Sequence, residues 1–274
     1  MESLADPRAA RALLAFWRAA GVDMEEAEAI YAGAPTRTGA PAAPREPLPL
    51  NRPVPKAKMK APVDAPVESA RALASAAKTV SELRAAVESF TGCALKATAR
   101  NTVFADGVEG APVLIIGEAP GKEEDEQGKP FVGRSGQLLD RMLAAIGLDR
   151  KYNVLISNTI YWRPPGNRDP TLGESLACLP FAERLVELSQ PKLLILTGKA
   201  ASQAMLKRED GVTRLRGRKL GYTREGFQAP INAMVMLHPA YLLRRPNEKR
   251  LAWGDLLLAQ AWLDELGVAR VSHP

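Results

Sequence analysis

Four short apolar runs recur in the second part of the chain, at intervals of about 40 residues. They are VLII from Val113, VLIS from Val154, LLIL from Leu193 and MVML from Met234. Segments with the period of a helix lie between them, such as residues 138–146. Strands and helices that alternate at this spacing predict a parallel β-sheet with helices on both faces.

The first 66 residues differ in composition from the rest. Residues 1–33 carry helical spacing and predict an N-terminal helical segment, either a short pair or one broken helix. Residues 34–66 hold nine of the 22 prolines, a composition typical of a flexible linker that forms no core. We expect one helix over residues 67–89 and one folded domain over residues 67–274.

Composition excludes several classes of protein. No apolar run reaches the roughly 18 residues of a membrane span, and the early acidic residues argue against a secretory signal. Two distant cysteines do not form a disulfide framework, so we expect a cytoplasmic protein. The net charge of +6 indicates a polyanionic partner, but residues 34–66 carry six Lys or Arg against Glu46 and Asp64 and supply four of those charges.

Polar residues follow the predicted strands. The strand ends read Gly117-Glu118, Asn158, Gly198-Lys199 and His238-Pro239. Ligands of open parallel sheets bind beyond the carboxyl ends of the strands. The sequence therefore predicts a site at this edge that combines a carboxylate, an amide and an imidazole.

Each of these residue types suits a step of base recognition or glycosidic chemistry. Glu118 and Asp125 would orient a water and stabilise a cationic sugar carbon. Phe131, between a proline and a glycine, would stack on a base, and Asn158 would read a pyrimidine edge. His238 would stabilise an oxyanion that forms on a departing base.

The residues alone leave ordinary structural roles open. Asp125 has the alternative of a capping or solvated acid, Phe131 of a core residue and Asn158 of a turn cap. A lone histidine such as His238 is more often structural. The glutamates within residues 123–126 are expected on a solvated face, because a run of charges is usually wet.

Basic residues near these motifs predict contacts to a phosphate backbone, with a solvated surface as the alternative for each group. A segment after His238 would fill the gap that an extruded nucleotide leaves, through Leu242, Leu243 and Arg244. The expected DNA-binding arginines are Arg163, Arg168, Arg214, Arg216, Arg218, Arg244 and Arg245.

Four motifs occur in a fixed order: GEAPGKEEDEQGKPFVGRSGQLLD, SNTIYWRPPGNRDP, TRLRGR and HPAYLLRRP. In this order they resemble the family 4 uracil-DNA glycosylases, over about residues 90–265. The resemblance implies a three-layer α/β/α sandwich around a four-stranded parallel sheet. It also implies an enzyme that flips uracil out of DNA and hydrolyses the N-glycosidic bond, leaving an abasic site.

The resemblance also assigns site residues. Glu118 and Asp125 would border the sugar and the attacking water, and His238 would stabilise the uracil anion. The residues assigned to the uracil pocket are Gly117, Ala119, Phe131 and Asn158.

The cysteines depart from the family pattern. Most members hold a [4Fe–4S] cluster on four cysteines, and the matching positions here are Phe90, Cys93, Trp162 and Cys178. Two thiolates and two large apolar side chains are a poor set for such a cluster. We expect no metal and no cofactor, with Phe90 and Trp162 packed near the two cysteines, although another residue that completes a cluster stays open as an alternative.

Three functions compete on these residues. The first is a monomeric uracil-DNA glycosylase, and the second is an inactive relative that clamps damaged or single-stranded DNA. A nucleotide-binding enzyme ranks last, because GEAPG lacks the P-loop and GxGxxG patterns.

Residues 1–66 would tether a repair or replication partner or add DNA affinity. One branch of the relatives implied by this resemblance captures DNA covalently through a reactive histidine in a basic insert. Residues 159–177 contain no histidine and no insert, so covalent capture of DNA is not expected.

Overall fold

Six β-strands form one sheet in the order β1-β3-β2-β4-β6-β5. The computed structural model describes residues 64–225 and 227–271, so the expected helical segment 1–33 and most of the expected linker lie outside the described residues. The strands are β1 (Ala105–Gly107), β2 (Val113–Gly117), β3 (Val154–Asn158), β4 (Leu193–Thr197), β5 (Leu220–Tyr222) and β6 (Ile231–Met236).

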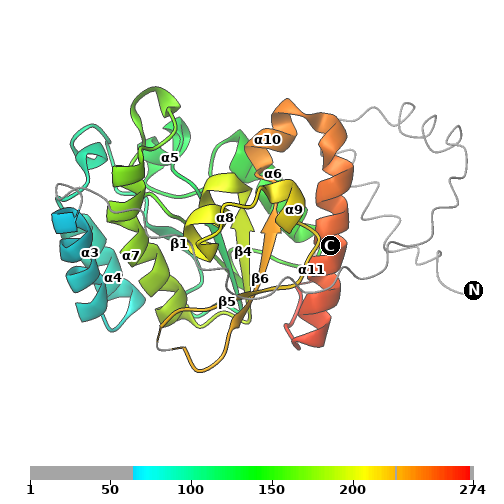
Figure 1. Cartoon of the computed structure of the whole chain (residues 1–274). Coiled ribbons are helices and arrows are strands. Elements are labelled where there is room, and N and C mark those ends of the chain that lie inside the picture. Colours follow the sequence, from blue (N-terminus) through cyan, green and yellow to red (C-terminus); the bar gives the residue numbers. More distant parts are fainter. Residues whose placement is uncertain (1–63, 226, 272–274) are drawn as a thin grey trace, which may run out of the picture.

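Helices connect and flank the strands. They are labelled as in Figure 1, and the short 3₁₀ turns are η1 (Ala94–Ala97), η2 (Pro165–Asn167) and η3 (Pro246–Glu248). The α-helices are α3 (Asp64–Ala76), α4 (Val80–Ser89), α5 (Lys122–Gln127), α6 (Arg134–Ala144), α7 (Leu172–Ser189), α8 (Gly198–Leu206), α9 (Val212–Leu215), α10 (Pro239–Arg244) and α11 (Lys249–Glu265).

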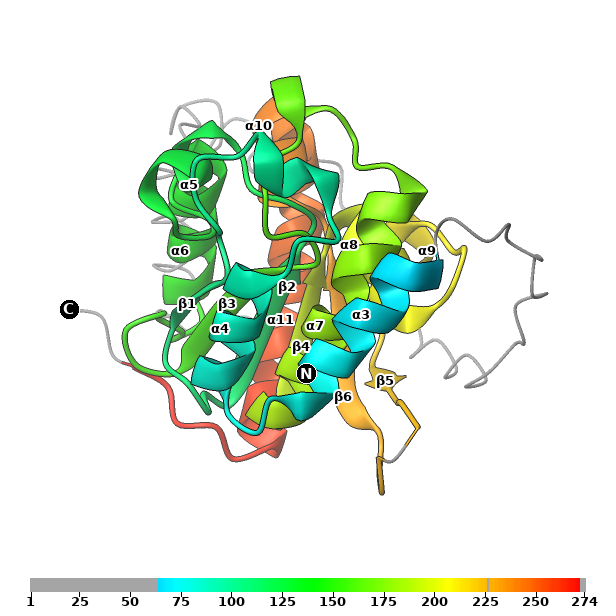
Figure 2. The ribbon, with the colours of Figure 1, turned by 90° about the vertical axis from the view of Figure 1, so that its left-hand side faces the viewer.

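The alternation of side chains along each strand separates two cores. Leu114 and Ile116 of β2 face a core that includes residues of α3, α4, α7 and α8. Val113 and Ile115 face the opposite core, with α6, α10 and α11. All four side chains are fully buried. The result is three layers, and Figures 1 and 2 show helices on both faces of the sheet.

The four expected strands form the parallel centre β3-β2-β4-β6, which confirms the predicted α/β/α class. Two edge strands were not predicted: β1 pairs antiparallel with β3, and β5 pairs antiparallel with β6. Their sequences, ADG and LGY, are too short to carry a recognisable alternation.

The expected helix over residues 67–89 is wrong in its continuity. The chain forms α3 and α4, and the hydroxyl of Thr79 caps α4 by accepting a hydrogen bond from the Glu82 N–H at 3.1 Å. Helix α3 also begins at Asp64, inside the segment expected as linker, with Pro66 in its first turn, where proline is tolerated. Within the described ranges, no helix is long and apolar enough to cross a lipid bilayer.

Parallel pairing brings the strand ends to one edge of the sheet. Gly117 of β2 lies opposite Asn158 of β3, and Thr197 of β4 lies opposite Met236 of β6. The turns that follow these residues therefore share one rim, as open parallel sheets require.

Candidate active site

A cleft of about 830 Å³ lies along this rim. Its lining includes Glu118 after β2, Asn158 at the end of β3, Gly198 after β4 and His238 after β6. Phe131 joins them from the loop between α5 and α6. The structure thus brings the predicted acid, aromatic ring, amide and imidazole into one site, within the usual size range of small-molecule sites of about 300–1,000 Å³.

Gly117 marks the point where two of these side chains meet. A Cβ atom built at Gly117 would lie 2.5 Å from Asn158 Oδ1 and 2.5 Å from Phe131 Cζ. Any side chain at this position would collide with both groups. The predicted pocket residue Gly117 therefore contributes space, while Ala119, two residues on, lines the cleft itself.

Asn158 presents an unused hydrogen-bond acceptor. The residue is 2% exposed, and its Oδ1 is buried without a hydrogen-bond partner in the described part of the chain. Such an atom costs about 1–3 kcal/mol of desolvation unless a donor meets it. Asn158 lines the cleft, so this acceptor belongs to the candidate site.

The Phe131 backbone is left-handed, with a φ of 53°, which is unfavourable for a residue with a side chain. Its ring is 4% exposed and lies 5.5 Å from the His238 ring, centroid to centroid, at an interplanar angle of 31°. Phe131 also packs with the core beside α6. The core role and the site role that the sequence left open are therefore combined in one side chain.

His238 is held as a neutral imidazole. It is the N-cap of α10, and its Nδ1 accepts a hydrogen bond from the Ala240 N–H at 3.1 Å. This bond leaves the ring proton on Nε2. Burial, followed by the charge of Arg244, lowers the pKa of His238 to about 4. At neutral pH the side chain is an uncharged donor.

Glu118 is fixed through its backbone. Its carbonyl oxygen accepts hydrogen bonds from the Ile160 N–H and from the Thr159 hydroxyl, both at 2.9 Å. Burial raises the pKa of the Glu118 carboxyl, and the charge of Asp169 raises it further. The cleft thus holds a second acidic residue, Asp169, whose charge acts on Glu118.

Asp125 is not brought together with these residues. Its Oδ1 accepts hydrogen bonds from the Arg100 N–H at 2.8 Å and from the Asn101 N–H at 3.3 Å, and it does not line the cleft. It ties α5 to the loop after η1.

Its neighbour Glu124 faces the cleft and was misjudged as a solvated acid. Glu124 is 6% exposed and accepts hydrogen bonds from the N–H groups of Gly121, Val132 and Gly133, at 3.1, 3.0 and 2.9 Å. Its carboxylate joins the two loops that carry Glu118 and Phe131.

Two of the expected DNA-binding arginines are engaged within the fold. Arg216 forms a bidentate pair with the buried Asp255, at 2.9 and 3.0 Å, and also donates to the Leu251 carbonyl. Arg168 lines the cleft but makes two hydrogen bonds to Glu174, at 2.7 and 2.9 Å. For Arg216 the expected contact with DNA is corrected, because all of its bonds hold the 212–219 loop on α11.

The remaining arginines lie nearer to solvent. Arg163 donates to the Asn167 side chain at 2.7 Å, and Arg218 is half-buried. Arg214 has a 67% exposed side chain, 3.3 Å from Asp210, and Arg245 is exposed.

Of the three residues predicted to fill the gap of an extruded nucleotide, the structure places two at the cleft. Leu242 is fully buried in the core with α6 and α11, so it does not reach a base stack. Leu243 and Arg244, the next two residues of α10, line the cleft.

Sequence reasoning missed several residues that line the cleft. Asp169 lies in the quoted RPPGNRDP motif, and Lys199 lies just after the apolar run that forms β4. Both residues therefore carried a positional signal in the sequence. Thr213 and Tyr241 also lie in quoted motifs, TRLRGR and HPAYLLRRP, but their place in the cleft depends on how α9 and α10 pack, which the sequence did not show.

Comparison with known proteins identifies the family of the chain that carries this cleft. The profile of the Uracil DNA glycosylase superfamily matches residues 104–258. The chain belongs to the uracil-DNA glycosylase superfamily. Within this superfamily it is similar to the type-4 uracil-DNA glycosylases.

The type-4 enzyme of Archaeoglobus fulgidus is 38% identical over 159 residues, 57% of this chain and 78% of that protein. The one from Thermotoga maritima is 33% identical, over 66% of this chain and 93% of that protein. The one from Sulfurisphaera tokodaii is 32% identical, over 65% of this chain and 81% of that protein.

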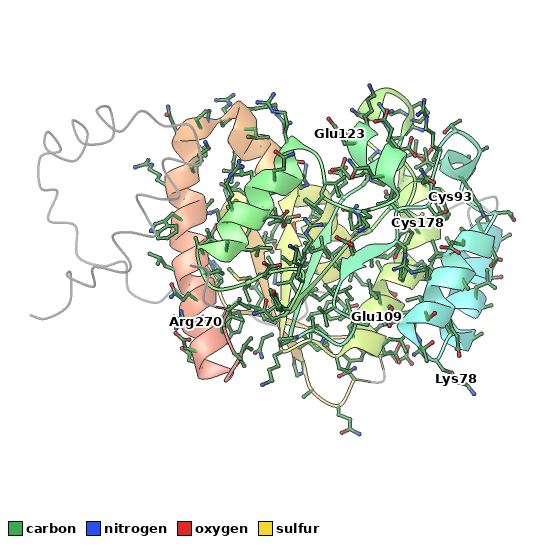
Figure 3. The ribbon with its side chains drawn as sticks, turned by 180° about the vertical axis from the view of Figure 1, so that it is seen from behind. Lys78, Cys93, Glu109, Glu123, Cys178 and Arg270 are labelled. Carbon is green, nitrogen blue, oxygen red and sulfur yellow. The ribbon has the colours of Figure 1, made fainter. Side chains whose placement is uncertain are left out.

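The resemblance to the family 4 enzymes implies an iron–sulfur cluster held by four cysteines. The residues of this chain at the four matching positions do not fit such a cluster. Figure 3 shows Cys93 and Cys178 beside each other, and their thiols are hydrogen-bonded. Phe90 and Trp162 fill the other two positions, with ring centroids 6.4 Å apart in the same core. No group of three or more potential metal ligands occurs in the described residues. Phe90 and Trp162 lie in the same core as both cysteines, and a chain with two cysteines cannot supply four thiolates.

The neutral state of His238 has a measurable consequence. We expect its imidazole signal to titrate near pH 4 in a proton NMR experiment, with a His273→Gln variant to assign the two histidines. The unfolded chain binds this proton near pH 6.5 and the folded chain near 4, so the free energy of unfolding decreases as the pH falls through this window. A pKa at or above the ordinary value of 6.5 would contradict the account in which burial lowers the pKa of His238.

Proposed function

We propose that this protein is a DNA glycosylase that flips uracil out of DNA and hydrolyses its N-glycosidic bond, leaving an abasic site. The observation that carries the proposal is the unpaired Oδ1 of Asn158 beside the Phe131 ring, in a cleft closed by a neutral histidine. Membership of the superfamily supports the same substrate class.

The uracil edge suits the amide of Asn158. The Oδ1 atom accepts the hydrogen bond from uracil N3–H, and the amide nitrogen donates to O4. Cytosine presents no N–H at N3, so it would leave the buried oxygen unpaired. Phe131 stacks on the base from its position above Gly117.

The leaving group is stabilised by His238. As the bond from C1′ to N1 breaks, negative charge develops on uracil N1 and O2. A neutral Nε2–H donates to O2 and stabilises that charge. The Nδ1 bond to the α10 backbone fixes the ring orientation that this requires.

Glu118 faces the sugar side. We assign to its carboxylate the orientation of the attacking water and the stabilisation of the cationic sugar. The water oxygen bonds to C1′ as the C1′–N1 bond breaks, and the proton of the water passes to the Glu118 carboxylate. Asp125 receives no catalytic role, because its carboxylate is occupied by two backbone N–H groups on the far side of α5. Asp169, whose charge acts on Glu118, takes its place as the second acid of the site.

DNA would lie across the rim of the cleft. Leu243 and Arg244 are the residues placed to fill the gap left by the flipped nucleotide. Lys199 at the cleft, with exposed Arg214 and Arg245, would contact phosphates.

The rest of the chain has a supporting role in this proposal. The glycosylase domain begins with α3, which packs on α7, and residues 1–63 tether a partner or add DNA affinity. We propose that the enzyme acts as a monomer in the cytoplasm and needs no metal.

A uracil-containing oligonucleotide tests the function. Incubation with the protein, then heating in alkali, should cut the strand at the uracil. Asn158→Ala and His238→Ala should each lower kcat/KM by about 10²–10³-fold, because each removes a bond that strengthens as charge develops.

Asn232→Ala is the matched control, because Asn232 lies at the opposite end of β6 and its side chain bonds to the Lys192 carbonyl. This variant should keep wild-type activity. Tight binding of the oligonucleotide with no cleavage would instead establish the inactive clamp.

The cysteine positions give a separate test. Protein purified without air should contain no stoichiometric iron and should lack the broad band near ~400 nm of a [4Fe–4S] cluster. One cluster's worth of iron per chain would overturn the assignment of Phe90 and Trp162 as filling residues.

A further inference from the structure

Arg150 is a half-buried guanidinium that contacts the backbone of Phe131. Its side chain is 14% exposed. Nη2 donates to the Phe131 carbonyl at 2.7 Å, and Nη1 donates to the Pro130 carbonyl at 3.1 Å. Two successive backbone carbonyls of the stacking loop are therefore held by one side chain.

Two carboxylates hold this guanidinium in turn. Asp140 Oδ1 accepts hydrogen bonds from Nε at 2.9 Å and from Nη2 at 2.8 Å, and Asp106 Oδ2 accepts one from Nη1 at 3.0 Å. The planar fork of an arginine has five N–H donors, and these five bonds engage all of its nitrogens. A lysine, with one nitrogen, cannot reproduce this arrangement.

The backbone that Arg150 contacts is strained. A left-handed φ is unfavourable at a residue with a side chain and persists only where the surroundings fix it. A Cβ at Gly136 would lie 1.9 Å from the Phe131 carbonyl oxygen, so the first turn of α6 presses directly against this carbonyl. Phe131 is thus enclosed by Gly136 on one side and bonded by Arg150 on the other.

We propose that Arg150 is a positioning residue for base recognition, which acts by holding the strained Phe131 backbone so that the ring lies over Gly117 beside Asn158. This inference rests on the proposed function, because it gives Arg150 its effect through base stacking. Arg150 does not line the cleft, so it acts through Phe131 and not on the substrate.

A double-mutant cycle tests this route. Arg150→Lys should lower kcat/KM on the uracil oligonucleotide by about tenfold, mainly through KM, and Phe131→Ala should lower it by about thirtyfold. In the Phe131→Ala background, Arg150→Lys should have no further effect beyond about twofold, because the ring it positions is gone. A full tenfold loss in that background would overturn the proposal.

Arg184→Lys is the matched control. Arg184 is also a largely buried arginine, 18% exposed, and it donates to the Ala77 carbonyl at 2.6 and 3.1 Å, away from the cleft. It should leave kcat/KM unchanged. If Arg150→Lys does not fold, Asp140→Asn, which removes a carboxylate that orients the guanidinium, replaces it in the same cycle with the same expected pattern.

A second readout is independent of catalysis. Incorporation of 4-fluorophenylalanine labels the six phenylalanines, and a Phe131→Leu variant assigns the Phe131 signal in ¹⁹F NMR. Arg150→Lys should shift or broaden that signal, and Arg184→Lys should not. An unchanged Phe131 signal would refute the positioning role. A shifted signal in a protein without uracil excision would instead refute the proposed function alone.

Discussion

The pairing of Gly117 with Asn158 at the carboxyl edge of the sheet is the constraint on which the site depends. Parallel register sets the amide of β3 beside the end of β2, and the missing side chain at Gly117 leaves room for both that amide and the Phe131 ring. The turn after Gly117 then directs Glu118 to the same cleft, with His238 across from it. A glycine in this register converts a sheet edge into a pocket for a flat ring.

Prediction from sequence succeeded where the signal was the spacing of apolar residues or the position of a residue at the end of a strand. Runs such as VLII are buried on both faces, so their position and the rim that they create could be predicted. The prediction was wrong where it had to choose between two neighbouring residues of a short helix. Successive side chains of a helix point in directions that differ by about 100° around its axis, so only one of two neighbours faces the cleft. Thus Glu124, not Asp125, faces the cleft, and Leu243, not Leu242, lines it. The arginines were overestimated for a related reason, because charge says nothing about partners such as Asp255, which holds Arg216.

Two features of the site lower the free energy of unfolding of the domain. An unpaired buried oxygen on Asn158 and a left-handed Phe131 each cost about 1–3 kcal/mol. Hydrogen bonds next to the site offset this cost. The Glu124 carboxylate accepts bonds from three backbone N–H groups, and the Arg150 guanidinium donates to two backbone carbonyls. Where relatives that this chain resembles would place two more cysteines, it packs Phe90 and Trp162 in its core.

The most direct test of the account is a crystal structure of the protein with free uracil bound. We expect the uracil ring to stack on Phe131 at about 3.5 Å, with N3–H donating to Asn158 Oδ1 at about 2.9 Å and O2 facing His238. Uracil bound elsewhere, or bound in the cleft with the Asn158 oxygen still unpaired, would contradict the claim that this amide and ring form the base pocket.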